Sequence, residues 1–137
     1  MLGQLKLLHA QMLACLDELE SLTKQSDPPI DRLPAVRLAL TRASRNRTAL
    51  LDRLHGQVVM LAAPKHKKEL EALKGEANDS LILSSQHIGL WTLREIVARW
   101  PDYCAASKDL RAAMRRRISR EAELIYPLLD KIASPIE

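Results

Sequence analysis

The fold of this chain is decided by the stretch RRRISREAELIYPLL, residues 115–129. This stretch is predicted to lie in the last long helix of an all-α protein, because apolar residues recur at spacings of three and four. The apolar stripe consists of Leu110, Met114, Leu124 and Leu128. Helical periodicity carries the same stripe through Arg117 and Glu121. Charged side chains are rarely buried unless they are paired or functional, so these two residues define a candidate site.

The length and the proline positions predict one helical domain. The 137 residues suit a single core, and we treat residues 1–137 as one domain. Prolines separate four long helices, which are expected at about residues 2–23, 33–61, 69–100 and 102–126. Pro127 is expected to bend or end the last helix before a short helical tail. Because the connections are short, the expected architecture is an antiparallel up-down-up-down four-helix bundle.

Charge and cysteine content narrow the class of protein. The formal net charge is +4, which favours anionic partners only weakly. The two cysteines, Cys15 and Cys104, are too few for a disulfide framework or a thiolate metal site. We therefore expect a reduced, cytoplasmic setting. The sequence contains neither a signal peptide nor a membrane-spanning apolar stretch, so no membrane partner is expected.

A second inward-facing arginine lies on the predicted second helix. Arg47 falls on an apolar stripe that includes Val36, Leu40, Ala43, Leu50, Leu54 and Val58. Arg47 and Arg117 each have a residue four positions later on the same face, Leu51 and Glu121. We expect Arg47, Arg117 and Glu121 to form a buried ion-pair cluster across the core. The basic run leaves open whether Arg117 or Arg116 faces inward, and an exposed Arg117–Glu121 pair is the alternative.

The stretch RISREAELIYPLL, residues 117–129, resembles the last motif of hemerythrin-like (HHE cation-binding) domains. The family pattern there is His-Ile-x-x-Glu-Glu-x-x-Leu-Phe/Tyr-Pro-Leu. His9, within LLHAQML, matches the histidine of the family's first helix, and His87 is a match for a histidine of the third. The resemblance implies a hemerythrin-like bundle in which five histidines and two carboxylates hold two iron atoms. It identifies Glu121 as the carboxylate of the last helix.

Departures from the family pattern predict that the metals have been lost. The resemblance places Arg117 and Arg47 at or next to positions of metal-ligating histidines, and Leu51 or Asp52 at the second carboxylate. A guanidinium stays protonated and cannot ligate a cation. We therefore expect a non-enzymatic, degenerate member without a cofactor. It would act as a binding or sensing module for an unidentified protein partner or small ligand.

Two alternatives use the same core residues. His9, His87 and Glu121 would suffice for a cation site with a reduced ligand set, either a mononuclear iron or a residual di-iron site. An anionic ligand would instead be surrounded by the inward arginines and their polar neighbours. That set consists of Arg47, Arg117, His9, His87, Ser80 and Ser84.

Nucleic acid is a remoter partner. Basic groups at residues 65–68 and around Arg115 and Arg120 would contact phosphates. They are not interleaved with aromatic residues, and no motif that reads DNA or RNA accompanies them. The sequence also contains no phosphate-binding loop, cofactor motif or nucleophile–base pair, so an enzyme is not expected. It does not specify the oligomeric state.

Overall fold

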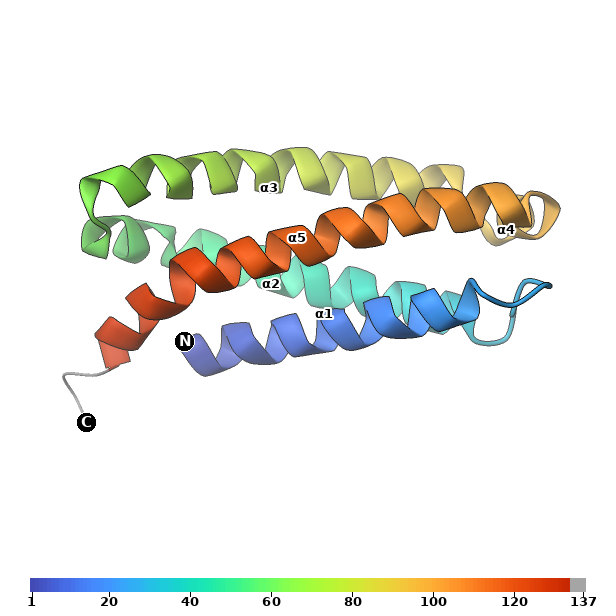
Figure 1. The fold of residues 1–137 in the computed structure, drawn as a ribbon, viewed down its shortest axis with the longest axis horizontal. Helices are drawn as coiled ribbons and strands as arrows, with labels where there is room; N and C mark the ends of the chain where they lie inside the picture. The colour runs from blue at the N-terminus through green and yellow to red at the C-terminus, as the bar shows by residue number, and fades with distance from the viewer. Residues whose placement is uncertain (134–137) are drawn as a thin grey trace.

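A computed structural model describes residues 1–133, which form five helices and no strand (Figure 1). The helices are α1 (Leu2–Leu22), α2 (Leu33–Leu61), α3 (Pro64–Leu90), α4 (Leu93–Ala98) and α5 (Trp100–Ala133). The predicted all-α class is therefore confirmed. The four long helices run along the length of the molecule, and the short α4 lies where α3 passes into α5 (Figure 1). Within residues 1–133, no helix is long and apolar enough to cross a membrane.

The first two helices bury the apolar stripes expected from their periodicity. The buried residues of α1 are Leu5, His9, Met12, Leu16, Leu19 and Leu22. Those of α2 are Leu33, Val36, Leu40, Ala43, Arg47, Leu50, Leu54 and Val58. Pro34 lies in the first turn of α2, where its missing N–H leaves no helical hydrogen bond unmade. At the end of α2, Leu61 is exposed and Ala62 is buried.

The apolar core consists of two clusters on either side of a polar layer. One cluster includes Met12, Leu16, Leu40, Ala43, Trp100, Tyr103 and Ile118. The other includes Leu5, Leu50, Leu54, Leu70, Leu73, Ile125 and Leu129. Three buried polar residues fall between them: His9 between Leu5 and Met12 on α1, Arg47 between Ala43 and Leu50 on α2, and Glu121 between Ile118 and Ile125 on α5. On α1, α2 and α5, the boundary between the two apolar clusters therefore lies at these polar residues.

The prediction of one helix up to about residue 100 is wrong. The third long helix ends at Leu90, and α4 begins at Leu93. Buried Trp91 anchors the break, and the Thr92 side chain caps α4 by accepting a hydrogen bond from the Glu95 N–H. This spacing of Thr and Glu is a capping box, a sequence signal for a helix start. The helix that was expected to begin at about residue 69 begins at Pro64, so residues 64–68 form the first turn of α3.

The second half of α3 packs less closely than expected. Its buried residues are Leu70 and Leu73, both near its N-terminal end. Helical periodicity would place Leu81 and Ile88 on the same inward face, but they are 43% and 41% exposed. Residues 81–83 are all apolar, and three consecutive positions cannot share one face of a helix. This part of α3 therefore has no narrow apolar seam.

The last helix continues past its predicted end. Pro127 lies inside α5, which runs on to Ala133, so the predicted tail is part of the same helix. Proline removes one helical hydrogen bond there, while Leu128 and Leu129 bury their side chains directly after it. Burial of these two residues keeps the end of α5 on the core.

Candidate functional site

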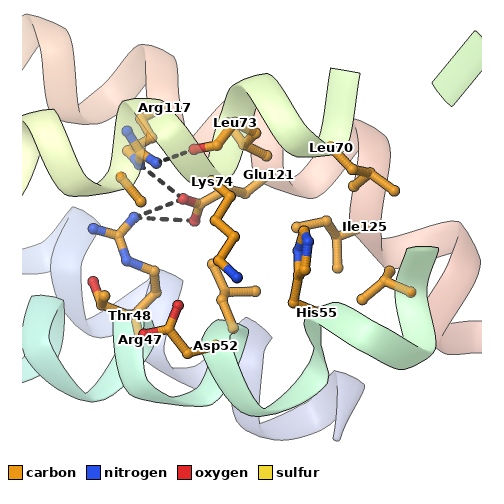
Figure 2. Close-up of a pocket in the computed structure, with 13 residues that line it drawn as sticks. Arg47, Thr48, Asp52, His55, Leu70, Leu73, Lys74, Arg117, Glu121 and Ile125 are labelled. Atoms are coloured by element: carbon orange, nitrogen blue, oxygen red, sulfur yellow. Dashed lines mark hydrogen bonds and ion pairs between the residues drawn. The ribbon is translucent and has the colours of Figure 1, made fainter. Parts of the chain in front are cut away.

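Glu121 is the centre of a buried polar cluster that consists of His9, Arg47, Arg117 and Glu121. Its side chain is 0% exposed. Oε1 accepts hydrogen bonds from His9 Nε2 at 2.8 Å and from Arg47 Nη1 at 3.0 Å. Oε2 accepts from Arg47 Nη1 at 2.9 Å and from Arg117 Nε at 3.0 Å. Figure 2 shows the carboxylate between the two guanidinium groups, so both oxygens are fully occupied.

The two arginines tie this cluster to the surrounding helices. Arg117 donates from Nη2 to the Leu73 carbonyl at 2.8 Å and from Nη1 to Ser80 Oγ at 2.9 Å, both on α3. Arg47 donates from Nη2 to Ser44 Oγ at 3.2 Å on its own helix. The register left open by the basic run is settled as well, because Arg117 is 8% exposed and Arg116 faces solvent.

His9 connects the cluster to Tyr126. A carboxylate only accepts hydrogen bonds, so His9 Nε2 must donate to Glu121. In the neutral imidazole the other nitrogen accepts, and the Tyr126 hydroxyl donates to His9 Nδ1 at 2.5 Å. Burial, with the charge of Glu121 as a second cause, raises the pKa of Tyr126. The phenol therefore keeps the proton that it donates.

The electrostatics of this cluster favour an ionised Glu121. Burial by itself raises the pKa of Glu121, but the hydrogen bond from His9 and the charge and hydrogen bonds of Arg47 outweigh it and lower the pKa. Burial lowers the pKa of Arg117, and the opposite charge of Glu121 partly offsets this. Two guanidinium groups face one carboxylate, so the cluster carries a positive charge when His9 is neutral.

A small cavity of about 40 Å³ adjoins the cluster. Figure 2 shows its lining, in which the two arginines and Glu121 lie beside apolar residues of α2, α3 and α5. Leu51 and Asp52, the positions that the resemblance assigns to the second carboxylate, both line this cavity. Neither makes a side-chain hydrogen bond to Glu121, whose partners are His9 and the two arginines.

These side chains do not fit the iron pair that the resemblance implies. Arg47 and Arg117 stay protonated and occupy the space around Glu121, and both of its oxygens accept hydrogen bonds from them. The His9 ring nitrogens are engaged with Glu121 and Tyr126. Within residues 1–133, no group of three or more His, Cys, Asp or Glu side chains is arranged to hold a metal ion.

The three residues of the predicted reduced metal-ligand set, His9, His87 and Glu121, do not lie in one place. His9 and Glu121 are in direct contact, but His87 lies elsewhere, with its ring centroid 5.9 Å from that of Tyr103. It lines a second cavity. The expected convergence of His9, His87 and Glu121 is therefore wrong. Periodicity places each residue on an inward face, but the height at which each helix passes its neighbours decides which residues meet.

The predicted anion-binding set is divided in the same way. Ser80 contacts Arg117 beside Glu121, whereas His87 and Ser84 line the second cavity. Sequence reasoning missed the three arginines of that cavity, Arg37, Arg45 and Arg111. Arg111 continues a series of buried residues at a spacing of four, which begins with Tyr103 and Ser107. That spacing is the signal from which an inward Arg111 was predictable.

The basic surface groups are partly neutralised by acidic neighbours. Arg115 forms ion pairs with Asp17 at 2.8 Å and with Glu20 at 3.2 Å, and these contacts join α5 to α1. Arg120 contacts Glu76 of α3 at 2.8 Å. These arginines connect helices within the chain, which leaves less of their charge for nucleic-acid phosphates.

Comparisons with known proteins leave the family resemblance a prediction. No protein-family model, no curated protein and no solved structure gives a significant match to this chain. The geometry of the described residues is therefore the basis on which a function is proposed.

Proposed function

We propose that this protein is a hemerythrin-like four-helix bundle that has exchanged its metal pair for an ion-pair cluster and serves as a non-enzymatic binding or sensing module. The observation that carries the proposal is the occupation of Glu121. Both carboxylate oxygens accept hydrogen bonds from the guanidinium groups of Arg47 and Arg117 or the imidazole of His9, which come from α2, α5 and α1. At positions where relatives would hold iron, this chain holds guanidinium groups.

In this proposal the cluster sets the register of the helices. A buried ion pair adds little net stability, because the loss of hydration offsets the attraction between the charges. It does penalise alternative packings, since sliding α5 by one residue would move Glu121 away from Arg47 and His9 together. The cluster thereby takes over the crosslinking role of a metal between the same helices.

The reactive side chains support a binding role over an enzymatic one. Burial raises the pKa of both Cys15 and Cys104, so these thiols are poor sources of thiolate nucleophile. Glu121 is held by three neighbours and sealed from solvent, which suits a structural anion better than a general base. A cytoplasmic setting, in which both thiols stay reduced, is part of the proposal.

Metal content tests this proposal. The full chain, expressed with iron and then desalted, is analysed by elemental analysis and visible spectroscopy. We expect far less than one metal per chain, no oxo-bridge absorption band, and an unchanged melting temperature after chelation. About two irons per chain with that band would overturn the proposal.

Two variants distinguish a core metal from one adsorbed at the surface. His66 lies at the exposed start of α3 and can collect metal adventitiously. Metal that disappears in Glu121→Gln but persists in His66→Ala would lie in the core and contradict the proposal. Metal that disappears only in His66→Ala would lie at the surface, as expected.

A further inference from the structure

A second cavity, of about 60 Å³, lies between α2, α3 and α5, away from the Glu121 cluster. One part of its wall is apolar and consists of Leu40, Leu81, Ile88, Leu110 and Met114. Another part carries three arginines, Arg37, Arg45 and Arg111. No aspartate or glutamate belongs to the lining. The cavity therefore combines a positive end with an apolar wall.

Within residues 1–133, no ion pair neutralises the arginines of this cavity. Arg111 is only 6% exposed, and its one side-chain hydrogen bond goes from Nη1 to Ser107 Oγ, a neutral partner, at 2.6 Å. Its Nε is buried without a hydrogen-bond partner, and so is Nη2 of Arg37. The carboxylate whose charge raises the pKa of Arg111 is that of Glu20, which forms an ion pair with Arg115. Arg47 and Arg117, by contrast, share Glu121.

A buried guanidinium with unsatisfied donors is costly to fold, since it gives up hydration without gaining a partner. Burial lowers the pKa of Arg111, which reflects this cost. A carboxylate from outside the chain would remove it, because the flat guanidinium fork matches two carboxylate oxygens. Buried Arg111 and half-buried Arg37 at one cavity make a pre-charged receptor for a single anion.

Neighbouring groups shape the rest of this cavity. Arg37 lies over the Tyr103 ring, with its guanidinium carbon 5.7 Å from the ring centroid. Burial, together with the charge of Arg37, lowers the pKa of His87 to about 4, so the imidazole is neutral near pH 7. A neutral imidazole can donate one hydrogen bond to an anion without adding charge.

We propose that this cavity binds a small amphiphilic carboxylate, with its carboxylate group at Arg37 and Arg111 and its hydrocarbon tail along Leu81, Ile88 and Met114. The apolar wall is the reason for a tail, since a strongly hydrated inorganic anion would lose water against it without compensation. Leu81 and Ile88 are half-exposed at the edge of α3, so a tail longer than the cavity extends along that helix.

This inference deepens the proposed function, because it names a ligand class for the binding module. The two share no residue, since the cavity uses Arg37 and Arg111 and the metal proposal concerns Glu121. A failure to bind carboxylates would therefore leave the metal-free core standing, and iron in the core would not remove the second cavity.

Isothermal titration calorimetry of the full chain tests the inference, at neutral pH and low ionic strength to limit screening. The probes are hexanoate, octanoate, hexanol and inorganic phosphate. We expect saturable binding of hexanoate, affinity that increases about fourfold per added buried methylene, and at least tenfold weaker binding of hexanol and phosphate. Equal binding of hexanol, or stronger binding of phosphate, would refute an amphiphilic carboxylate site.

Arg111→Met and Arg37→Gln should each weaken octanoate binding by about ten- to a hundredfold, the range for a lost charge-assisted hydrogen bond. The ligand-free Arg111→Met protein should melt at the parent temperature or above, because an unpaired buried charge has been removed. That result separates a ligand-binding role from a structural one. The control is Arg116→Gln, because Arg116 is an exposed arginine of the same helix. This variant should bind octanoate like the parent. Parental affinity in folded Arg111→Met would overturn the inference.

Discussion

Replacing Glu121 with alanine would remove the carboxylate that pairs with both Arg47 and Arg117. Both guanidinium groups are less than a tenth exposed, and their buried positive charges would lose this carboxylate partner. Removing one partner of a buried ion pair costs about 3–5 kcal/mol. For a domain of this length, 1 kcal/mol corresponds to about 4 °C in melting temperature. We therefore expect Glu121→Ala to melt about 12–20 °C below the parent.

Urea unfolding followed by far-ultraviolet circular dichroism measures this change in free energy, and thermal melting provides a second estimate. The matched control is Arg120→Ala, which breaks the exposed contact with Glu76 on the same stretch of α5. An exposed pair contributes about 1 kcal/mol or less. Arg120→Ala should therefore unfold close to the parent, whereas Glu121→Ala should not.

A combined variant tests whether the cost comes from unpaired charge rather than from lost volume. His9→Leu, Arg47→Met, Arg117→Met and Glu121→Leu together remove every charge of the cluster and keep similar volumes. Replacing a whole buried ion-pair network by apolar residues is often neutral or stabilising, so this variant should regain most of the stability lost in Glu121→Ala. If Glu121→Ala unfolds within about 1 kcal/mol of the parent, a buried and coupled cluster is refuted.

Three further outcomes are expected. The lowered pKa of Glu121 contributes stability that is present above the ordinary carboxyl pKa and is lost as pH falls through the pKa of the folded state. In Glu121→Gln the free energy of unfolding should therefore fall less steeply with decreasing pH than in the parent. An identical pH profile would contradict an ionised Glu121. Tyr126→Phe removes the hydrogen bond to His9 and should cost about 1 kcal/mol in urea unfolding; no change would exclude that bond. In proton NMR titrations His87 should stay neutral down to about pH 4. The free energy of unfolding should fall as pH drops below about 6.5, the pKa of histidine in the unfolded chain. Protonation of His87 near pH 6.5 would contradict its burial.

Much of the helical framework was predictable from local pattern. The stripe of α1 and the inward position of Arg47 on α2 follow from a spacing of three and four, which is a property of each helix alone. The contact of Arg117 with Glu121 lies within one helical turn and is equally local. The break after Leu90 was also readable, because Thr92 and Glu95 have the spacing of a capping box.

The partners of those residues were decided only by the tertiary structure. Periodicity shows that a side chain points inward, but the relative heights of the helices determine what it meets. His9 therefore reaches Glu121, while His87, inward by the same reasoning, lies beside Tyr103. Arg117 and Arg111 lie on one helix, yet the first finds a carboxylate and the second does not. Sequence thus indicated the inward faces of α1 and α2. Packing determined which buried charges are satisfied, because hydrogen bonds between helices depend on distances that no local pattern encodes.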